Sequence, residues 1–254
     1  MTNKTTKICC TLALLATTAA TPALSQAKNF EGPSISLGAS AVGTNTDVNI
    51  TTAPDVGTFN FGKNISAVPF VDVSYVFPGN GNFMFGLGAR YDFAKNKSGG
   101  ISDTSNLDNI NTGVDSEDAD VFDDITVTSD LNMSYKDHKS IYLMPMYLVN
   151  NSSALFAKLG YHETKGTLRF TQNIAGITAV GDLVFEENTT ISGSKNFQGY
   201  GVGLGFRTVL SNNLYLQIEA EMVDYDKESV ASGNTTISFK PKPLSASLSV
   251  GYKF

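Results

Sequence analysis

Cysteine is nearly missing from this chain, and its two copies, Cys9 and Cys10, both stand within the first ten residues. The rest of the chain can therefore form neither a disulfide nor a thiolate metal site. Basic residues are also scarce, with 18 Lys and Arg against 24 Asp and Glu and a formal net charge of −6. A nucleic-acid partner requires a basic footprint, which this sequence does not have. We expect no nucleic-acid partner, no metal and no cofactor.

Long apolar runs are missing too, since no stretch approaches the roughly 18 residues of a membrane-spanning helix. The run 8–20 is short, follows Lys4 and Lys7, and leads through Pro22 to small residues. That order is typical of a secretory signal peptide, and cleavage after Ser25 or after Ala27 fits equally well. We predict a cleaved signal over 1–27, which holds both cysteines, and a single domain over 28–254. A membrane protein without apolar helices must be a closed β-barrel, because lipid leaves backbone polar groups no other partner.

The chain does have strict alternation, most clearly in residues 244–254, which read LSASLSVGYKF. Leucine, alanine, valine, Tyr252 and Phe254 share one parity, and serine, glycine and Lys253 share the other. In a strand these two sets point to opposite faces. The length matches the roughly 9–11 residues of a tilted strand that crosses a bilayer.

Seven earlier segments alternate in the same way, and their connections are sorted by length. We predict these strands at 32–44, 64–77, 83–93, 126–147, 155–161, 197–209 and 214–222. The short turns at 78–82, 150–153 and 211–213 alternate with longer polar connections at 45–62, 95–125, 163–196 and 226–235. A soluble sandwich has no reason to sort its connections, whereas an outer-membrane barrel has short turns on one side and long loops on the other. The pattern predicts an all-β, eight-stranded antiparallel up-and-down transmembrane barrel. Weak alternation over 167–184 could extend a strand above the membrane.

Four stretches carry a resemblance to a known family: FGLGARY at 85–91, GYGVGLGF at 199–206, LYLQIEAE at 214–221 and GYKF at 251–254. With them the whole chain after the signal resembles the small eight-stranded outer-membrane barrels of the OmpA-type and opacity-protein-like family. The resemblance implies periplasmic turns, extracellular loops, outer-membrane lipid around the barrel and a bacterial outer-membrane location. It also implies that Tyr252 and Phe254 belong to the C-terminal signal read by the barrel-assembly machinery.

Several charged residues take the inward parity, and we expect them to form an ion-pair network in the lumen. An eight-stranded barrel is only just wide enough for its interior to be filled by side chains, so ionised groups there must pair. We place Arg90 and Arg207 with Glu219 and Glu221 at its centre. The predicted network comprises Asp72, Arg90, Lys158, Arg207, Glu219 and Glu221, with Asp92 and Lys253 on the same parity. The four glycines at 199, 201, 203 and 205 remove side chains from one face, which must therefore meet crowding or close curvature.

Only His138-Lys139-Ser140 suggests an enzyme, because it resembles the His-x-Ser of outer-membrane lipid A deacylases. It sits mid-chain, no acid follows it on the strand, and both residues take the parity away from lipid. The acidic connection at 95–125 could supply carboxylates to Ca²⁺, but it lacks the glycine and terminal glutamate of a calcium loop and is better interpreted as a solvated surface loop.

We therefore expect a non-enzymatic surface protein, a barrel anchor that displays acidic and polar extracellular loops and serves envelope integrity, surface contact or adhesion to a host or surface ligand. A narrow porin or small-solute channel is the alternative, and a lipid-modifying enzyme is the third reading.

Overall fold

The computed structural model describes residues 27–52, 55–60, 64–98, 100–110, 122–178, 183–211, 213–232 and 235–254. The predicted signal peptide lies outside these residues, apart from its last position. Within the described ranges, no helix is long and apolar enough to span a bilayer.

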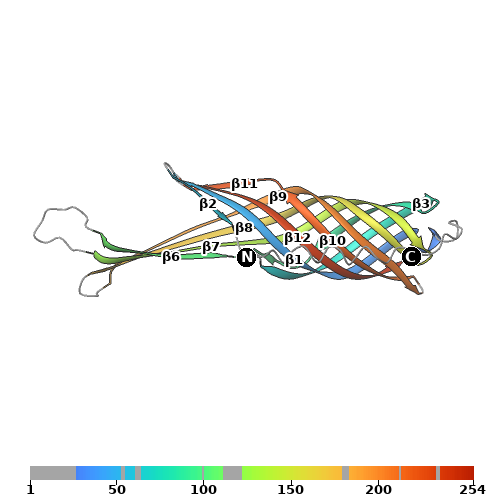
Figure 1. The fold of residues 1–254 in the computed structure, drawn as a ribbon, viewed down its shortest axis with the longest axis horizontal. Coiled ribbons are helices and arrows are strands. Elements are labelled where there is room, and N and C mark those ends of the chain that lie inside the picture. Colours follow the sequence, from blue (N-terminus) through green and yellow to red (C-terminus); the bar gives the residue numbers. More distant parts are fainter. Residues whose placement is uncertain are drawn as a thin grey trace, which may run out of the picture.

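Twelve strands and one short 3₁₀ turn make up the described chain, in the order shown in Figure 1. They are η1 (Ala27–Asn29), β1 (Gly32–Thr52), β2 (Asp55–Asn60), β3 (Ile65–Asn80), β4 (Phe83–Asp92), β5 (Asn96–Lys97), β6 (Ile101–Ile110), β7 (Phe122–Asn150), β8 (Ser153–Thr178), β9 (Leu183–Ser211), β10 (Leu214–Tyr225), β11 (Glu228–Ser232) and β12 (Thr235–Lys253).

Eight of these strands close into a ring, which confirms the predicted barrel. Neighbours pair antiparallel in the order β12-β10-β9-β8-β7-β4-β3-β1, and β1 returns to pair with β12 from Ser34↔Lys253 to Thr52↔Thr235. In Figure 1 the strands wind steeply around the long axis. Short turns join β3 to β4, β7 to β8 and β9 to β10, at the end of the barrel that holds the C terminus.

The two walls of the ring face opposite environments. Outward residues are apolar and exposed, as for Leu37 at 64% and Leu204 at 71%, whereas inward Lys158 and Glu219 are only 2% and 6% exposed. Aromatic side chains flank this apolar belt, with Phe83, Tyr147, Tyr252 and Phe254 near the turns and Tyr91, Phe93, Tyr161 and Tyr200 at the far rim. The residues of the apolar parity thus face outward, as the alternation predicts.

Beyond the far rim the polarity of both walls inverts. Along β12 the outward residues within the belt, from Val250 to Leu244, are apolar. Beyond the rim the outward residues are Lys242, which pairs with Asp47 at 2.9 Å, and Lys240, which pairs with Asp224 at 2.9 Å. The inward series changes at the same level from serines to Phe239 and Ile237, both buried. A strand that leaves lipid for water must bury its apolar residues inside, since no lipid remains to receive them. The hydrogen bond and the charge of Asp47 raise the pKa of the exposed Lys242 ammonium.

A bulge lets β7 follow the same inversion. Asp137 and His138 together oppose the single residue Thr164, between the pairs Lys136↔Lys165 and Lys139↔Glu163. One extra residue reverses the parity of the strand. Odd-numbered residues after the bulge, such as Ile141, therefore face outward, whereas odd-numbered residues before it, such as Tyr135, face inward. Asp137 takes the left-handed conformation, with φ 55°.

Most of the four long connections predicted as loops are strands. β3, β4 and β10 end near the far rim, so the ring opens there into two four-stranded sheets. We call β2-β1-β12-β11 the hairpin sheet and β6-β7-β8-β9 the long sheet. In Figure 1 the long sheet runs past the ends of β2 and β11. The connections at 45–62, 95–125, 163–196 and 226–235 were thus wrongly assigned to loop over much of their length, because their serines, threonines and asparagines occupy the solvent face of a sheet. The exception is the weak alternation over 167–184, which β8 confirms as far as Thr178.

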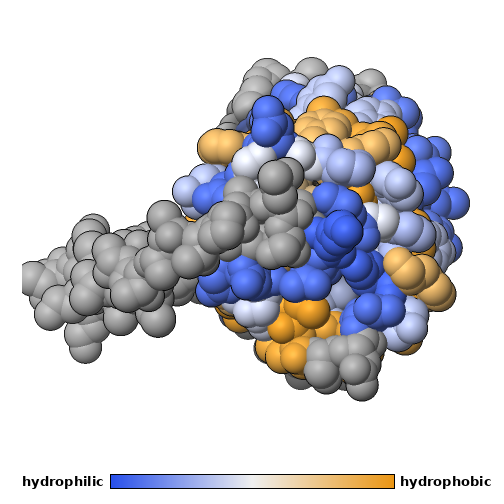
Figure 2. Space-filling model, turned by 90° about the vertical axis from the view of Figure 1, so that its right-hand side faces the viewer, coloured by the Kyte–Doolittle hydropathy of each residue, from blue (hydrophilic) through white to orange (hydrophobic). Residues whose placement is uncertain are grey.

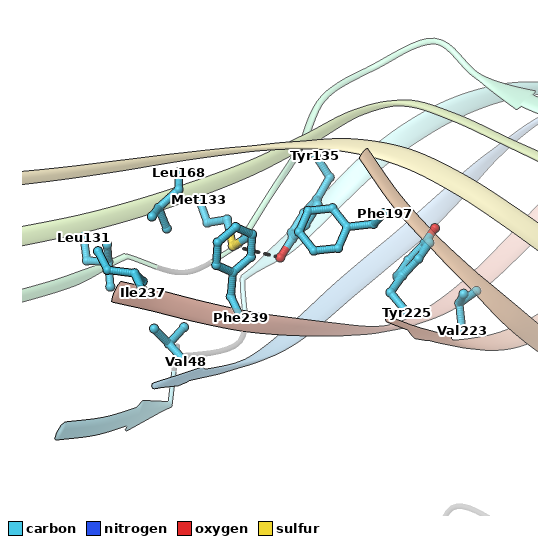
Figure 3. Close-up of a cluster of buried hydrophobic side chains, with 10 residues drawn as sticks. All are labelled: Val48, Leu131, Met133, Tyr135, Leu168, Phe197, Val223, Tyr225, Ile237 and Phe239. Atoms are coloured by element: carbon cyan, nitrogen blue, oxygen red, sulfur yellow. Dashed lines mark hydrogen bonds between the residues drawn. The ribbon is translucent and has the colours of Figure 1, made fainter. Parts of the chain in front are cut away.

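The two sheets share an apolar core above the belt, drawn in Figure 3. The hairpin sheet contributes Val48, Ile237 and Phe239, the long sheet contributes Leu131, Met133, Tyr135, Leu168 and Phe197, and β10 contributes Val223 and Tyr225. Tyr135 donates a hydrogen bond to the Met133 sulfur at 3.0 Å, and its hydroxyl lies 2.9 Å from Thr46 Oγ1. Burial raises the pKa of this phenol, while the Thr46 contact lowers it.

A second apolar layer fills the barrel at the short-turn end. Phe30 enters it from the N-terminal segment and is 2% exposed. The other members are Val76, Met84, Tyr142, Met144, Met146, Leu148, Ala154 and Phe156. The N-terminal segment is held across this end by Asn29 Nδ2, which donates to Asn151 O at 2.7 Å, and by Lys253 Nζ, which donates to Lys28 O at 2.6 Å. Figure 2, seen toward this end, shows hydrophilic side chains over much of it and hydrophobic patches at its flanks.

Candidate functional site: the closed lumen

Lys158 of β8 lies at the centre of the polar layer between the two apolar ones. Its Nζ is 2.7 Å from Glu219 Oε2 of β10 and 3.4 Å from Asp72 Oδ2 of β3. Tyr142 of β7 donates to the same Asp72 carboxylate, at 2.7 and 2.8 Å, and its ring lies 4.1 Å from Lys158 Nζ. Four strands are therefore tied together across the lumen, and one cation serves two carboxylates.

Arg207 of β9 extends this layer without meeting a carboxylate directly. Its Nε donates to Gln217 Oε1 at 2.8 Å, and Gln217 Nε2 donates to Glu219 Oε2 at 3.2 Å. The Arg207 guanidinium also stacks over the Tyr215 ring at 4.3 Å. An amide thus relays the arginine to the carboxylate that Lys158 holds.

A second group lies nearer the far rim and contains both histidines of the chain. Arg90 Nε donates to Asp92 Oδ1 at 2.8 Å, and His138 Nδ1 lies 2.8 Å from Asp92 Oδ2. His138 Nε2 is in turn 3.1 Å from His162 Nδ1, with the two rings stacked. Arg90 is further fixed by Ser40 Oγ at 2.6 Å and by the Phe70 ring at 3.8 Å.

Glu221 completes this group loosely. His162 Nε2 lies 3.5 Å from Glu221 Oε1 without hydrogen-bond geometry. Among the described residues, His162 Nε2 and Glu219 Oε1 are buried side-chain atoms without a hydrogen-bond partner. The upper group and the layer around Lys158 each therefore contain a buried polar atom without a partner.

Glycines make room for the large lumen side chains. A Cβ at Gly88 would collide with the Tyr142 ring, one at Gly205 with Phe156, and one at Gly201 with His162. The crowding expected beside the glycine series of β9 is confirmed. Close approach, rather than backbone conformation, explains glycine at these positions.

A small cavity remains between the histidine group and the upper apolar core. It measures about 50 Å³ and is lined by Arg90, Asp92, His138 and Glu221 on one side and by Tyr135 and Tyr225 on the other. Such a volume holds about three waters. The lumen is thus filled by an apolar layer, a charged layer and a second apolar layer in succession.

All six predicted network residues face the lumen and are buried, but their partners differ from the expected ones. Arg90 binds Asp92 and Arg207 binds Gln217, while Lys158 occupies the centre assigned to the two arginines. Lys253 lies at the short-turn end, bound to a backbone carbonyl. Sequence reasoning missed Tyr142, Gln217 and His162 and treated His138 only as part of the His-x-Ser pattern. Alternation gives the face of a residue but not its height or its partner across the barrel.

The arrangement around His138 does not form a hydrolase triad. An acid does orient His138, since Asp92 reaches it from the neighbouring chain segment. The other ring nitrogen, which would have to accept a serine proton, faces His162 instead of Ser140. Ser140 faces the lumen and is only 6% exposed. In the described part of the chain, no group of three or more His, Cys, Asp or Glu side chains is placed to hold a metal ion.

Tyr252 and Phe254 lie on the outer wall at the short-turn end. They are 41% and 69% exposed, and their rings meet edge to face at 5.2 Å. Phe254 N donates to Pro33 O at 3.0 Å, so the last residue is still paired with β1.

Several solved structures and one family model are similar to this chain. The solved structures to which the chain is similar include Ail, the attachment invasion locus protein of Yersinia pestis (13% identity, 88% of this chain and 99% of that chain covered, TM-score 0.37), OprG from Pseudomonas aeruginosa (14%, 88% and 96%, TM-score 0.45) and the outer membrane protease OmpT from Escherichia coli (9%, 93% and 99%, TM-score 0.44). No curated protein matches the chain. The model of the outer membrane protein β-barrel domain matches residues 10–254.

That match covers nearly the whole chain, and the ring, the apolar belt and the short turns are those of such a domain. The chain therefore belongs to the outer membrane protein β-barrel family, and its place is the bacterial outer membrane.

Proposed function

We propose that the protein is a non-conducting membrane anchor whose role is to hold the two-sheet extension at the cell surface. The observation that carries this proposal is the filled lumen. Phe30 and its neighbours occupy one end, the core around Phe197 occupies the other, and Lys158 spans the middle. In this reading the barrel serves envelope integrity, and the sheets serve surface contact or adhesion.

The extension has the features of a displayed structure. It is built from continuous strands with their own apolar core, so it presents its surface in a defined geometry instead of as flexible loops. Its outer wall carries paired charges such as Lys242 with Asp47 and Lys139 with Glu163, at 2.9 and 3.2 Å. These features support contact with other molecules in water. Neither the separate core nor the paired surface charges would help a solute to pass through the barrel.

Planar-bilayer conductance tests this proposal against the narrow porin. Purified, refolded protein, checked for folding by its heat-modifiable gel mobility, should insert without producing discrete conductance steps. Reproducible single-channel openings that disappear on heat unfolding would replace the anchor with a channel. The lipid-modifying enzyme is tested in parallel, since phospholipid hydrolysis that is lost in Ser140→Ala would replace it with a hydrolase.

We further propose that the C-terminal strand engages the barrel-assembly machinery through Tyr252 and Phe254. Both rings are exposed at the edge of the belt, where another protein can reach them before the barrel closes. Deletion of Phe254 should reduce the amount of folded protein in the outer membrane more than Phe93→Ala does at the opposite rim. Equal amounts would remove this role.

A further inference from the structure

The long sheet continues beyond the shared core, and its two faces there differ. We call this projecting part, residues 122–130 of β7 and the segments of β6, β8 and β9 paired with them, the blade. β7 and β8 remain paired from Leu131↔Phe170 outward to Phe122↔Thr178, while the hairpin sheet ends at Thr52↔Thr235 and Ser232. At about 3.3 Å per residue, β7 projects on the order of 30 Å past Leu131. Figure 1 shows these strands continuing past the tips of β2 and β11. Among the described residues, no sheet faces the blade beyond the tips of β2 and β11.

The face of the blade that is continuous with the core has two rows with apolar side chains in the middle, a polar row between them, and one exposed acid at each edge. Successive registers place Ser105, Val127, Ile174 and Glu187 in one row across β6, β7, β8 and β9. The row nearer the core ends with Leu131, Phe170 and Ile191, and the row between them carries Asp103, Ser129, Gln172 and Thr189. Val127, Ile174 and Ile191 are partly exposed, and Asp103 and Glu187 are exposed.

The opposite face differs clearly. It carries hydroxyl and amide side chains that bond to one another, such as Thr104 with Thr128 at 3.5 Å and Thr126 with Asn106 at 3.1 Å, together with the acids Asp130 and Glu186. A sheet that is polar on both faces would need no cover. Here only the face continuous with the core is apolar, and partly exposed apolar side chains on a projecting sheet indicate a contact surface.

The charge around this face selects the kind of partner. Between Ser98 and Tyr135 the sequence has no Lys or Arg, while acids recur through it. A second copy of the chain would bring acid against acid, and like charges oppose such a pairing. Asp103 on β6 and Glu187 on β9 stand three strand spacings apart, which is about 14 Å. A helix with its side chains is about 10–12 Å across and fits between these two acidic edges.

We propose that this face binds a cationic amphipathic helix of another protein. The apolar stripe of the helix packs on Val127, Ile174 and Phe170, and its flanking lysines or arginines reach Asp103 on one edge and Glu187 on the other. Apolar burial supplies the affinity, and the two acidic edges supply the selection for a basic partner. This inference deepens the display role and rests on it.

The test uses the full protein in nanodiscs of zwitterionic lipid and a fluorescent 14-residue helical peptide, with leucine at positions i, i+3, i+4 and i+7 and lysine elsewhere. Fluorescence anisotropy should report saturable binding above that to empty nanodiscs. The double variant Asp103→Lys/Glu187→Lys should weaken binding at least tenfold, and so should Val127→Ser/Ile174→Ser. The matched control Glu228→Lys, on the hairpin sheet, should bind like the wild type, and a peptide with glutamate for lysine should not bind.

Several results would overturn the proposal: no binding above empty nanodiscs, binding unchanged in both double variants, or dimers of the wild-type protein that Val127→Ser/Ile174→Ser dissolves in sedimentation velocity. Circular dichroism shows that each variant is folded. Conductance separates failure of this proposal from failure of the anchor role. A barrel that neither conducts nor binds the peptide would contradict the helix-binding face and leave the anchor role standing.

Discussion

Lys158 is the residue on which the charged layer depends. Its single ammonium group holds Glu219 at 2.7 Å and Asp72 at 3.4 Å in the middle of a filled lumen. Removing one partner of a buried ion pair leaves an uncompensated charge, which costs far more than the pair itself contributes.

Lys158→Met should therefore lower the free energy of unfolding by about 3–5 kcal/mol. Urea unfolding of the protein in lipid vesicles, followed by tyrosine fluorescence, measures this loss. The companion variant Lys158→Met/Glu219→Gln should recover part of the stability, because one of the two stranded charges is gone. If Lys158→Met alone is as stable as the wild type, the charged layer does not stabilise the barrel.

Gly88 is the second residue that the lumen constrains. An alanine there displaces the Tyr142 ring, which is bound to Asp72 at 2.7 Å, so the strain passes into the contacts of Lys158. We expect Gly88→Ala to destabilise by about 1–3 kcal/mol, the usual range for overpacking. Gly43→Ala is the matched control, since its nearest neighbours would lie 3.9 Å from the new Cβ. If both variants melt alike in detergent, steric fit at Gly88 is not the reason for glycine there.

At this scale the sequence predicts which wall a side chain occupies, but not what it touches. Period-two alternation placed Asp72, Arg90 and Glu219 in the lumen correctly. Their partners depend on strand tilt and stagger around the ring, which bring residues from β3, β7, β8 and β10 to the same height. Neither quantity can be read from one strand, so the bridge through Lys158 and Tyr142 was not foreseen.

At the scale of elements, the β7 bulge connects the membrane part to the surface part. Asp137 is the extra residue that lets Tyr135 and Met133 join the upper core while Ile141 and Leu143 stay on the outer wall. Without it, all of these residues would share one face.

Deletion of Asp137 should disorder the surface sheets and spare the barrel. Limited proteolysis of whole cells should then cut within 122–135 and 164–178, while the heat-modifiable gel shift persists. Asp137→Gly is the control, since glycine adopts the left-handed conformation more easily and keeps the bulge. If the deletion is as protease-resistant as the control, the bulge does not position this core.

The eight membrane-crossing strands could be predicted because each has a complete alternation bounded by a recognisable turn. Above the belt, the predicted strand from residue 126 is confirmed by β7, and the weak alternation over 167–184 is confirmed by β8 as far as Thr178. The other strands above the belt were missed because the polarity of their faces inverts. A signal for them was present: Lys240 and Lys242 alternate with Ile237 and Phe239, and Glu163 and Lys165 lead into Leu168 and Phe170. Such segments look like polar loops until the change of solvent from lipid to water is considered.

At the scale of the molecule, the surroundings of the long strands change from lipid to water along their length. The same continuous strands expose apolar residues to lipid up to the far rim and then, beyond it, expose charge to water around an apolar core. A closed lumen, the anchor role and the helix-binding face all depend on this change of environment along a strand. Since the only cysteines are Cys9 and Cys10, in the predicted signal, single-cysteine labelling can follow it without background.

Spin-label accessibility along β8 measures this change from lipid to water position by position. Nitroxides are placed one at a time from Leu155 to Arg169 in protein reconstituted in lipid. Outward positions up to Tyr161 should collide with oxygen, outward positions from Glu163 onward should collide with a water-soluble nickel complex, and inward positions from Phe156 to Leu168 should be protected from both. Nickel access at Lys158 or Gly160, or oxygen access continuing through Lys165 and Arg169, would contradict the account.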